Sequence, residues 1–193
     1  IGWKAAQSMA FALELPLVGV NHVEAHLYSP WFQGDPPRAC WDEFQPNISL
    51  VISGGHTLLA QVDQLLEHTI IGGTQDDAAG ECFDKCAKLL RLGYPGGPVI
   101  DRLAVRGNPK AYTFARPMLN QNNHDFSFSG LKTSVRYFLE KNPMLGEDDT
   151  ALPDLCASIQ AAIVEVLVKK TIRAARRQRL SCITLSGGVA SNT

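Results

Sequence analysis

The sequence predicts an α/β fold whose ligands bind where strands end. Short apolar runs bounded by polar or glycine residues, such as 48–52 and 182–185, are typical of buried strands. Longer segments whose apolar residues recur three and four positions apart, such as 153–179, are typical of helices, and they alternate with the strands. Both of these strands run directly into a Ser-Gly-Gly turn. Because ligands of open α/β sheets bind at such strand ends, we expect the functional site there.

The composition is that of a globular chain. Of 193 residues, 45% are hydrophobic and 19% are charged, which excludes disordered, collagen-like and coiled-coil proteins. No apolar run reaches the ~18 residues of a membrane-spanning helix, and no signal-peptide pattern is visible, so we expect a cytoplasmic protein without a membrane partner. The cysteines are odd in number, which favours reduced thiols. Because the chain lacks an initial Met and stops just after a glycine turn, we expect a fragment of a longer protein.

The first elements are expected to complete one lobe of the protein. The pattern of apolar residues predicts a helix over 3–14 and a short buried strand over 17–20. A second helix, over 22–29, is expected to begin after Asn21, which is a good N-cap, and to stop at Pro30.

A proline-rich loop over 34–46 is the best candidate for the boundary between lobes. Beyond it we expect a strand, a hairpin-like turn, a second strand, three helices and a last strand, at 48–52, 53–57, 58–62, 76–92, 131–141, 153–179 and 182–185. Asp76 or Asp77 is the expected N-cap of the first of these helices, and the glycine-rich segment 93–98 ends it.

His22 and His26 form the first candidate site. Residues four apart lie on one face of a helix, so both imidazoles can reach a single metal ion. Two ligands do not hold a metal tightly, and a third has to come from elsewhere. Glu24 lies on the opposite face at about 100° per residue, unlike the glutamate of zinc proteases, which argues against proteolysis. Two unrelated histidines are the alternative interpretation.

The turn at 53–57 is the second candidate site. Its two glycines let backbone N–H groups approach a phosphate closely, and the hydroxyls of Ser53 and Thr57 add donors. The same pattern recurs at 186–192, where Asn192 is placed to hydrogen-bond a base or a ribose. A pair of such turns fits a nucleotide clamped between lobes, whereas either turn alone also fits an ordinary hairpin.

Two predicted helices carry further candidates. Asp84, together with Asp101, could accept hydrogen bonds from two ribose hydroxyls, although a solvated acidic helix face is the alternative. Cys82 and Cys86 lie one helical turn apart, wider than in zinc ribbons, which favours packing over metal binding. Several cationic side chains lie at the end of the predicted helix 153–179. They either contact RNA phosphates or only interact favourably with the helix dipole. These cations are Lys169, Lys170, Arg173, Arg176, Arg177 and Arg179.

Taken together, the motifs resemble the TsaD (Gcp) family of tRNA threonylcarbamoyladenosine synthases, in order and over essentially the whole chain. They are His-Val-Glu-Ala-His at 22–26, Leu-Val-Ile-Ser-Gly-Gly-His-Thr at 50–57, Asp-Asp-Ala-Ala-Gly-Glu at 76–81, Phe-Asp-Lys at 83–85, Tyr-Pro-Gly-Gly-Pro at 94–98, the segment 125–133, and Gly-Gly-Val at 187–189 with Asn192. The resemblance implies an actin-like (ASKHA) ATPase-superfamily fold of two lobes, each a mixed β-sheet with flanking helices. Residues 1–47 would be the C-terminal part of the first lobe, with the metal-binding helix. Residues 48–193 would be the second lobe, with a helical insertion and a truncated end.

The resemblance also implies a reaction. The threonylcarbamoyl group passes from threonylcarbamoyl-AMP to the exocyclic amine of the tRNA adenosine beside the anticodon. His22 and His26 would bind one divalent metal ion, Fe²⁺ or Zn²⁺, whose third ligand, an aspartate, lies beyond Thr193. The residues implied to hold the adenylate are Val51, Ile52, Ser53, Gly54, Gly55, Asp84, Gly97, Asp101 and Asn192.

The implied partners are tRNA and, in bacteria, TsaB-like and TsaE-like proteins. An organellar member would be mitochondrial and can work alone. Because the third metal ligand and the family's N-terminal phosphate segment lie outside these residues, we expect the chain alone to be inactive. A metalloprotease and a non-catalytic nucleotide-binding scaffold are the alternative functions.

Overall fold

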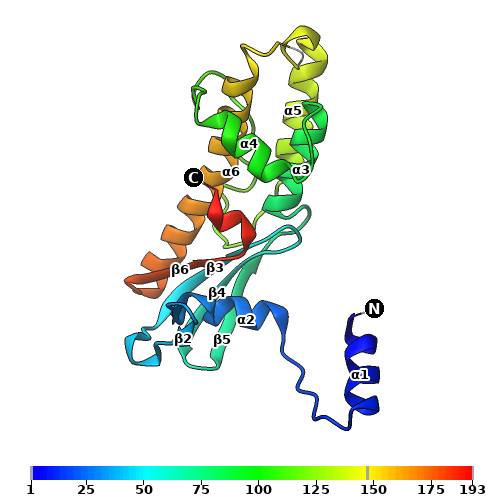
Figure 1. Cartoon of the computed structure of the whole chain (residues 1–193). Coiled ribbons are helices and arrows are strands. Elements are labelled where there is room, and N and C mark those ends of the chain that lie inside the picture. The colour runs from blue at the N-terminus through cyan, green and yellow to red at the C-terminus, as the bar shows by residue number, and fades with distance from the viewer. Residues whose placement is uncertain (1, 147, 193) are drawn as a thin grey trace.

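A mixed sheet lies at the centre of the computed structural model, which describes residues 2–146 and 148–192 (Figure 1). Its four strands follow the order β5-β4-β3-β6. The strands are β3 (Asn47–Ile52), β4 (Thr57–Gln64), β5 (Glu67–Gly73) and β6 (Cys182–Ser186). Antiparallel pairs join β3 to β4 and β4 to β5, whereas β6 pairs with β3 in parallel. The predicted α/β class, with a mixed sheet and flanking helices, is therefore confirmed.

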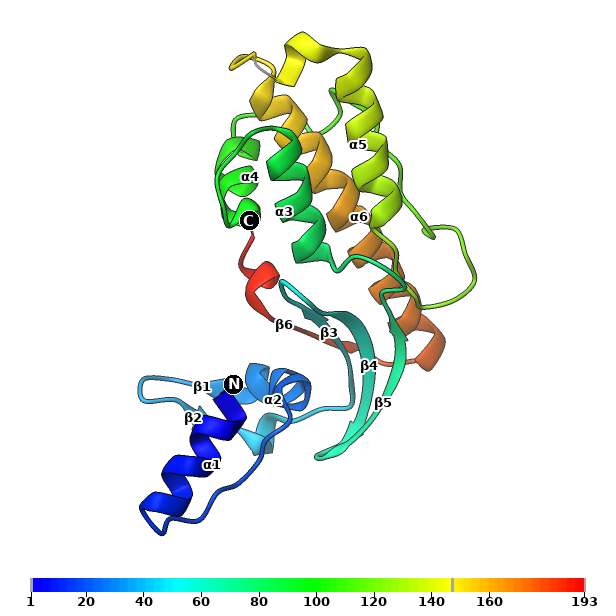
Figure 2. The same ribbon diagram turned by 90° about the vertical axis from the view of Figure 1, so that its right-hand side faces the viewer.

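Helices cover both faces of this sheet (Figure 2). One face carries α2 (His22–Tyr28), and the other carries α3 (Ala79–Leu89), α4 (Gly96–Ala104), α5 (Ser129–Lys141) and α6 (Leu152–Gln178). Leu50 and Ile52 of β3 join the larger core with α3, α5 and α6, while Val51 between them packs with Leu27 of α2. Because successive side chains of a strand point to opposite faces, this one strand supports both layers.

The long helix α6 supplies much of the larger core. Ile159, Ile163 and Val166 are fully buried along it, at the spacing of a single helix face. The helix ends at Arg179, whose φ of 56° is left-handed. The helices predicted over 131–141 and 153–179 are confirmed as α5 and α6, with small shifts at their ends. Within the described part of the chain, no helix combines the length and the hydropathy that crossing a bilayer requires.

The N-terminal segment agrees less well with the prediction. α1 (Gly2–Ala12) confirms the first predicted helix, although none of its residues is buried. The predicted strand over 17–20 is wrong, because the segment is irregular and Val18 and Val20 are 81% and 76% exposed. A strand needs a hydrogen-bonded neighbour, and no strand of residues 2–146 and 148–192 pairs with this segment.

The second predicted helix and the loop behind it are confirmed. α2 begins after Asn21, whose Oδ1 accepts hydrogen bonds from the N–H groups of Val23 and Glu24 at 2.9 and 3.2 Å. Beyond it the chain forms only short elements, namely η1 (Ser29–Trp31), β1 (Phe32–Gln33), β2 (Arg38–Ala39) and η2 (Trp41–Glu43). The loop over 34–46 therefore contains a minimal hairpin strand and one turn of 3₁₀-helix.

The start of α3 differs from the prediction. Its N-cap is Ala78, which makes no side-chain capping hydrogen bond, so neither Asp76 nor Asp77 caps this helix. Asp76 instead accepts hydrogen bonds at the start of α5, and Asp77 pairs with Lys85. An N-cap directly precedes the first helical residue, and both aspartates lie too early in the chain.

Two further differences concern glycines. Gly96 and Gly97 open helix α4, with Pro95 as the N-cap, rather than remaining in a turn. β5 was not predicted, because it contains little apolar sequence besides two isoleucines and ends in Gly72 and Gly73. The remaining short elements are η3 (Pro143–Gly146) and η4 (Gly188–Ser191).

Candidate functional site

Two glycine turns leave the sheet side by side. β3 and β6 run parallel with Val51 opposite Ser186, so both turns lie at the same edge. Gly187, at a φ of 93°, approaches β3 so closely that a Cβ atom there would be 2.3 Å from the carbonyl oxygen of Ile52. Only glycine fits such an approach at positive φ. The second of the two turns that the sequence predicts to bind phosphate therefore packs against the end of β3, directly before the first turn.

Gly80 brings the start of α3 against the first turn. A Cβ atom at Gly80 would lie 2.6 Å from the carbonyl oxygen of Ser53 and 2.7 Å from Cα of Gly54. Beside it, the Ala79 N–H donates to Oγ1 of Thr57 at 2.8 Å. Small residues at 78–80 thus let the backbone of α3 lie directly against the backbone of the turn.

The first turn leaves its two glycines open. The Ser53 N–H donates to the carbonyl oxygen of His56 at 2.8 Å, and Oγ of Ser53 accepts from the His56 N–H at 3.1 Å. Among the described residues, apart from each glycine and its two chain neighbours, no atom lies within 4 Å of the Cβ position of either Gly54 or Gly55. A ligand therefore has room directly against the backbone of these two glycines.

Three side chains beside this turn are buried. Val51 and Ile52 are buried in the two cores at 0% and 6% exposure, so only their backbone can contact a ligand. Thr57 is buried as well, and its hydroxyl accepts the hydrogen bond from α3. The hydroxyl therefore supports the start of α3, while the expectation that it donates its own proton to a ligand stays a prediction.

A second group of predicted residues meets at the start of α4. Oδ1 of Asp84 accepts a hydrogen bond from the Gly96 N–H at 2.7 Å. A Cβ atom at Gly97 would lie 3.9 Å from Oδ1 of Asn192. Nδ2 of Asn192 is buried and has no hydrogen-bond partner among the described residues. Buried donors are rarely left in this state, so the Asn192 amide is a donor available to a ligand.

Asp101 joins this group through a neighbour. Its Oδ1 accepts a hydrogen bond from Nε2 of Gln160 on α6 at 3.1 Å. Gln160 and Asn192 line one cavity between α4 and α6, whose other walls are mainly the apolar side chains of Ala104, Val105, Pro109, Ala157, Ala161 and Val164. Asp84 and Asn192 thus lie beside the first turn of α4, and Gly97 and Asp101 belong to this helix itself.

The predicted histidine pair faces the first glycine turn. The rings of His22 and His26 lie edge to face with their centroids 4.6 Å apart. The ring of His56, which directly follows Gly54 and Gly55, has its centroid 5.9 Å from that of His22. Sequence reasoning missed His56 as a member of this cluster, although its position after the two glycines was a usable signal.

The chemistry of these side chains suits a metal ion in part. Burial, with the nearby charges of His22 and His56, lowers the pKa of His26, which favours the neutral imidazole that binds metals. Imidazole nitrogens suit both zinc and iron. Within residues 2–146 and 148–192, no group of three histidine, cysteine or acidic side chains has the geometry to hold a metal. The pair therefore fits two of the ligands of a metal site and leaves the others to be supplied.

Glu24 lies on the other side of α2. Glu24 and Tyr28 are four residues apart in α2, so their side chains share a helix face, and burial together with the negative charge of Glu24 raises the pKa of the Tyr28 hydroxyl. Tyr28 belongs to the core beneath α2. This placement supports the geometric argument that Glu24 cannot serve the histidine pair as a general base.

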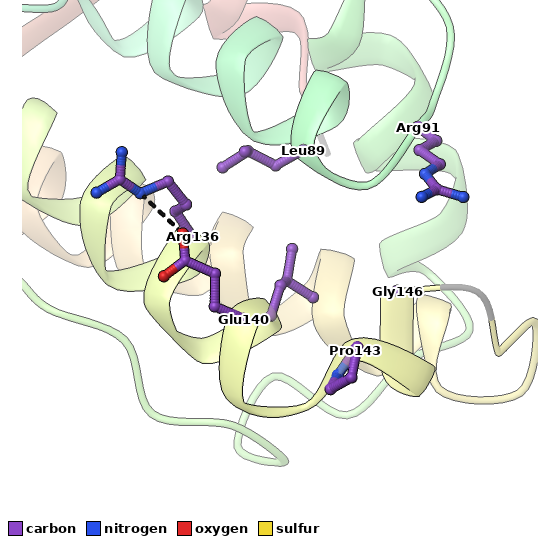
Figure 3. A pocket seen from close by; sticks show the side chains of 7 residues that line it. Leu89, Arg91, Arg136, Glu140, Pro143 and Gly146 are labelled. Carbon is purple, nitrogen blue, oxygen red and sulfur yellow. Dashed lines mark ion pairs between the residues drawn. The ribbon is translucent and has the colours of Figure 1, made fainter.

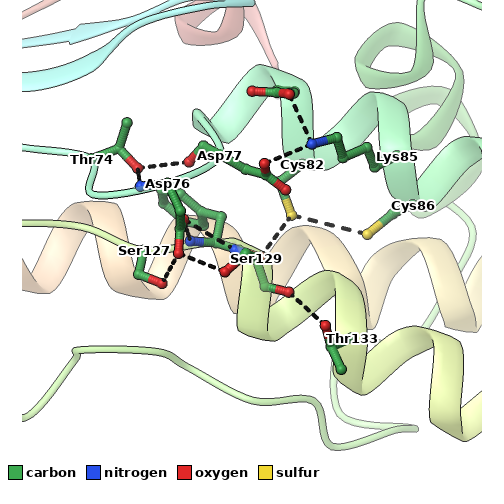
Figure 4. Close-up of polar contacts among 11 residues, drawn as sticks. Thr74, Asp76, Asp77, Cys82, Lys85, Cys86, Ser127, Ser129 and Thr133 are labelled. Carbon is green, nitrogen blue, oxygen red and sulfur yellow. Dashed lines mark hydrogen bonds and ion pairs between the residues drawn. The ribbon is translucent and has the colours of Figure 1, made fainter.

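Asp76 ties the approach to α3 to the start of α5 (Figure 4). Its carboxylate accepts hydrogen bonds from the hydroxyls of Ser127 and Ser129, both at 2.6 Å, and from the N–H groups of Phe128 and Ser129 at 2.8 and 3.2 Å. Burial opposes ionisation, but these hydrogen bonds outweigh it and lower the pKa of Asp76 to about 2. The sequence indicated no such partners 51 to 53 residues away.

Lys85 of α3 partly neutralises two acidic side chains near the start of this helix. Nζ of Lys85 lies 2.6 Å from Oδ1 of Asp77 and 2.8 Å from Oε1 of Glu81, and these contacts raise the pKa of Lys85 (Figure 4). On the inner face of the helix, Cys82 and Cys86 are fully buried with their sulfur atoms 4.0 Å apart. The expected packing role of these two cysteines is confirmed.

A separate pocket lies where α3 and α5 end (Figure 3). Leu89 and Arg91 line one side, and Arg136 and Glu140 line the other, with the last two joined by an ion pair of 3.4 Å. None of the predicted site residues lines this pocket.

Comparison with known proteins gives a consistent result. The family model for TsaD, tRNA N6-adenosine threonylcarbamoyltransferase, matches residues 1–193. Curated proteins named tRNA N6-adenosine threonylcarbamoyltransferase from Syntrophotalea carbinolica, Ralstonia pickettii and Thermotoga neapolitana are 51%, 50% and 47% identical to this chain. The matches cover 100% of this chain but 54%, 54% and 56% of these relatives. The chain thus spans about half the length of the curated relatives it matches.

Proposed function

Because the chain belongs to the TsaD family of tRNA N6-adenosine threonylcarbamoyltransferases, we propose that it carries part of the reaction site of such an enzyme. That enzyme transfers the threonylcarbamoyl group of threonylcarbamoyl-AMP to the exocyclic amine of the adenosine beside the anticodon of tRNA. One observation supports the proposal above all others. The histidine pair of α2 faces a glycine turn that has open space at its backbone, with His56 bridging the two.

In this proposal the adenylate binds along the edge where β3 and β6 end. The backbone N–H groups of Gly54 and Gly55 face the phosphate, and the buried amide of Asn192 faces the ribose or the base. Backbone from Val51 to Ser53 lines the same turn, and the start of α4 contributes Gly97, with Asp84 and Asp101 beside it.

One divalent ion, Fe²⁺ or Zn²⁺, is proposed to bind His22 and His26, with an aspartate beyond this chain as the third ligand. When bound, it supplies a Lewis acid that polarises the oxygens of the threonylcarbamoyl group. His56 contacts the same ring cluster and helps to orient His22. The sequence motifs alone left open whether the histidine pair and the first glycine turn lie at the same edge of the sheet.

The transfer requires no nucleophile from the protein. The tRNA amine forms a bond to the carbamoyl carbon and loses one proton, and the bond from that carbon to the phosphate oxygen breaks. The N–H groups of the glycine turn stabilise the negative charge on the departing AMP, which is the role of an oxyanion hole. No Ser-His-Asp arrangement is needed for this mechanism.

A two-lobed, actin-like architecture completes the proposal. Residues 1–47 end the first lobe and residues 48–193 form the second, with α4 and α5 in its helical insertion. The exposed apolar side chains of α1 and its connection, such as Met9, Phe11 and Val18, support a further covering surface in the complete protein. TsaB-like and TsaE-like proteins are the proposed partners, in the cytoplasm, and the chain by itself is proposed to be inactive.

The test is a chimera in which this chain replaces the matching segment of its 51% identical relative. The chimera is incubated with threonylcarbamoyl-AMP and unmodified tRNA, and the nucleosides are analysed by mass spectrometry. We expect threonylcarbamoyladenosine to form, and to disappear in the His22→Ala chimera. A chimera that forms none while the parent relative does contradicts the proposal. Peptide cleavage that is lost on Glu24→Gln would favour a metalloprotease instead.

A further inference from the structure

The C-terminal end of α6 carries a cluster of cations that the proposed reaction does not use. We call it the basic patch, and it consists of Lys169, Arg173, Arg176, Arg177 and Arg179. Arg173 is half-buried and the other four side chains are exposed. Four of the five, all but Arg179, line one surface hollow together with Ile172.

The positive charge of the basic patch is largely unneutralised. Lys169 pairs with Glu165 at 2.5 Å, but no carboxylate of the described residues forms an ion pair with any of the four arginines. The negative end of the α6 dipole favours cations here, yet it amounts to only about half an elementary charge. Four guanidinium groups exceed what the dipole can offset.

Two of these arginines are held in place. Arg173 donates to the carbonyl oxygens of Leu119 and Gln121 at 3.0 and 2.9 Å, and Arg177 donates to the carbonyl and side-chain oxygens of Asn122. A guanidinium has five N–H donors, so each keeps donors for a further acceptor. Because these side chains are already ordered, binding a phosphate costs them little conformational entropy.

We propose that the basic patch binds the phosphate backbone of the substrate tRNA. The inference rests on the proposed function, since that function supplies a polyanionic substrate that any enzyme of this kind has to orient. Unpaired, pre-ordered arginines match phosphate oxygens in charge and in geometry. Such contacts position an RNA without reading its sequence.

The location of the basic patch fits this role. β6 starts close to the end of α6 and runs to the glycine turn at its other end (Figure 1). A strand of this length covers roughly 17 Å at about 3.4 Å per residue. Along the axis of a B-form duplex each strand carries one phosphate per about 3.4 Å, so a duplex advances that distance in roughly five base pairs. One anticodon arm can therefore reach the glycine turns and the basic patch together.

The experiment measures binding of unmodified tRNA to this chain by fluorescence anisotropy between 50 and 200 mM salt. Over this range the affinity of a protein with many phosphate contacts falls by about 10³-fold or more. The test variant is Arg176→Gln/Arg179→Gln, because neither side chain anchors the loop at 119–122. The matched control is Arg38→Gln/Arg106→Gln, which removes the same charge from exposed positions on β2 and after α4. Circular dichroism verifies that all variants fold.

We expect the test variant to weaken tRNA binding about tenfold or more and to reduce the salt slope of log Kd by about 2, roughly one per lost phosphate contact. The loss should be equal for a tRNA whose adenosine beside the anticodon is replaced by guanosine. A control that weakens binding as much as the test variant overturns the proposal, as does a folded wild-type chain that binds no tRNA. Transfer by the chimera, measured separately, reports on the proposed function alone.

Discussion

The imidazole ring of His56 lies 5.9 Å from that of His22. His56 ends the first glycine turn, and His22 begins α2 on the opposite side of that turn from α3. Two segments that are 34 positions apart in the numbering thus meet at one point. In our proposal, the metal ligands and the phosphate-binding turn therefore belong to a single site.

Removing one imidazole should abolish metal binding without unfolding the protein. In the chimera with the relative, His22→Ala leaves His26 as the sole ligand on α2, and one histidine holds a divalent ion weakly. We expect about one ion per chain in the parent and close to none in the variant, measured by plasma mass spectrometry. His68→Ala on β5 is the matched control and should keep its metal. Unchanged metal content in His22→Ala contradicts the assignment.

Filling the open space at the first turn should impair nucleotide binding but not stability. A Cβ atom at Gly54 meets no described residue within 4 Å other than its chain neighbours, so Gly54→Ala should unfold at the same urea concentration as the parent. In the chimera we expect it to bind AMP about tenfold more weakly, or ~1.4 kcal/mol, because the methyl group occupies the phosphate position. Calorimetric titration measures this, and Gly93→Ala, which is equally open, serves as control. Unaltered AMP affinity in Gly54→Ala argues against a phosphate at this turn.

The opposite result is expected at Gly80. Its Cβ would lie 2.6 Å from a backbone oxygen and 2.7 Å from a backbone carbon, neither of which can rotate away. Gly80→Ala should therefore destabilise the chain by about 1–3 kcal/mol, the usual cost of overpacking. Urea unfolding followed by circular dichroism measures the difference against Gly93→Ala. If both variants unfold alike, α3 does not press on the turn as described.

Asp76 should make stability depend on acid. Its pKa is about 2 in the fold and 3.8 as the ordinary value, so its contribution is complete above about pH 5 and is lost as the pH falls toward 2. Because the side chain is exposed, we discount the shift for solvent screening and expect a contribution of about 1 kcal/mol. Urea unfolding at pH 7 and pH 2.5 measures the free energy of unfolding at both values. The parent should lose this contribution of Asp76 at pH 2.5, whereas Asp76→Asn lacks it at both pH values.

Asp63→Asn is the control for that experiment, because Asp63 accepts a single hydrogen bond from the side chain of Gln61 on the same strand. It should keep the acid dependence of the parent. An Asp76→Asn variant with the parent's full pH dependence would show that the four hydrogen bonds of Asp76 contribute no stability.

Elements with their own local signal were predicted well from the sequence. The N-cap Asn21 marked the start of α2, and the apolar run before Gly54 marked β3. The long apolar face around Ile159 and Ile163 predicted α6. In each case the deciding information lies within a few residues of the element, so no knowledge of the tertiary fold was required.

The predictions that were wrong or incomplete concern residues whose structure depends on partners distant in the chain. Val18 and Val20 have strand composition, but a strand also needs a neighbour to pair with, and the described residues offer none. Asp76 was predicted to cap α3, but its carboxylate accepts hydrogen bonds from the N–H groups of Phe128 and Ser129 at the start of α5 instead. The place of His56 in the histidine cluster depends on how α2 packs over the sheet, which periodicity along the chain does not encode.

The close approaches of Gly187 and Gly80 have a consequence for selectivity. Gly187 packs against the backbone of Ile52, and Gly80 packs against the backbone of Ser53 and Gly54. The first glycine turn is thus held by backbone from two other segments of the chain. These contacts involve backbone atoms, which cannot move away by a change of rotamer, and closely packed backbone shifts little. In our proposal the turn thus has fixed dimensions, and a ligand of different shape has to be accommodated on the side of α2, the short helix whose N-terminal end bears the exposed His22.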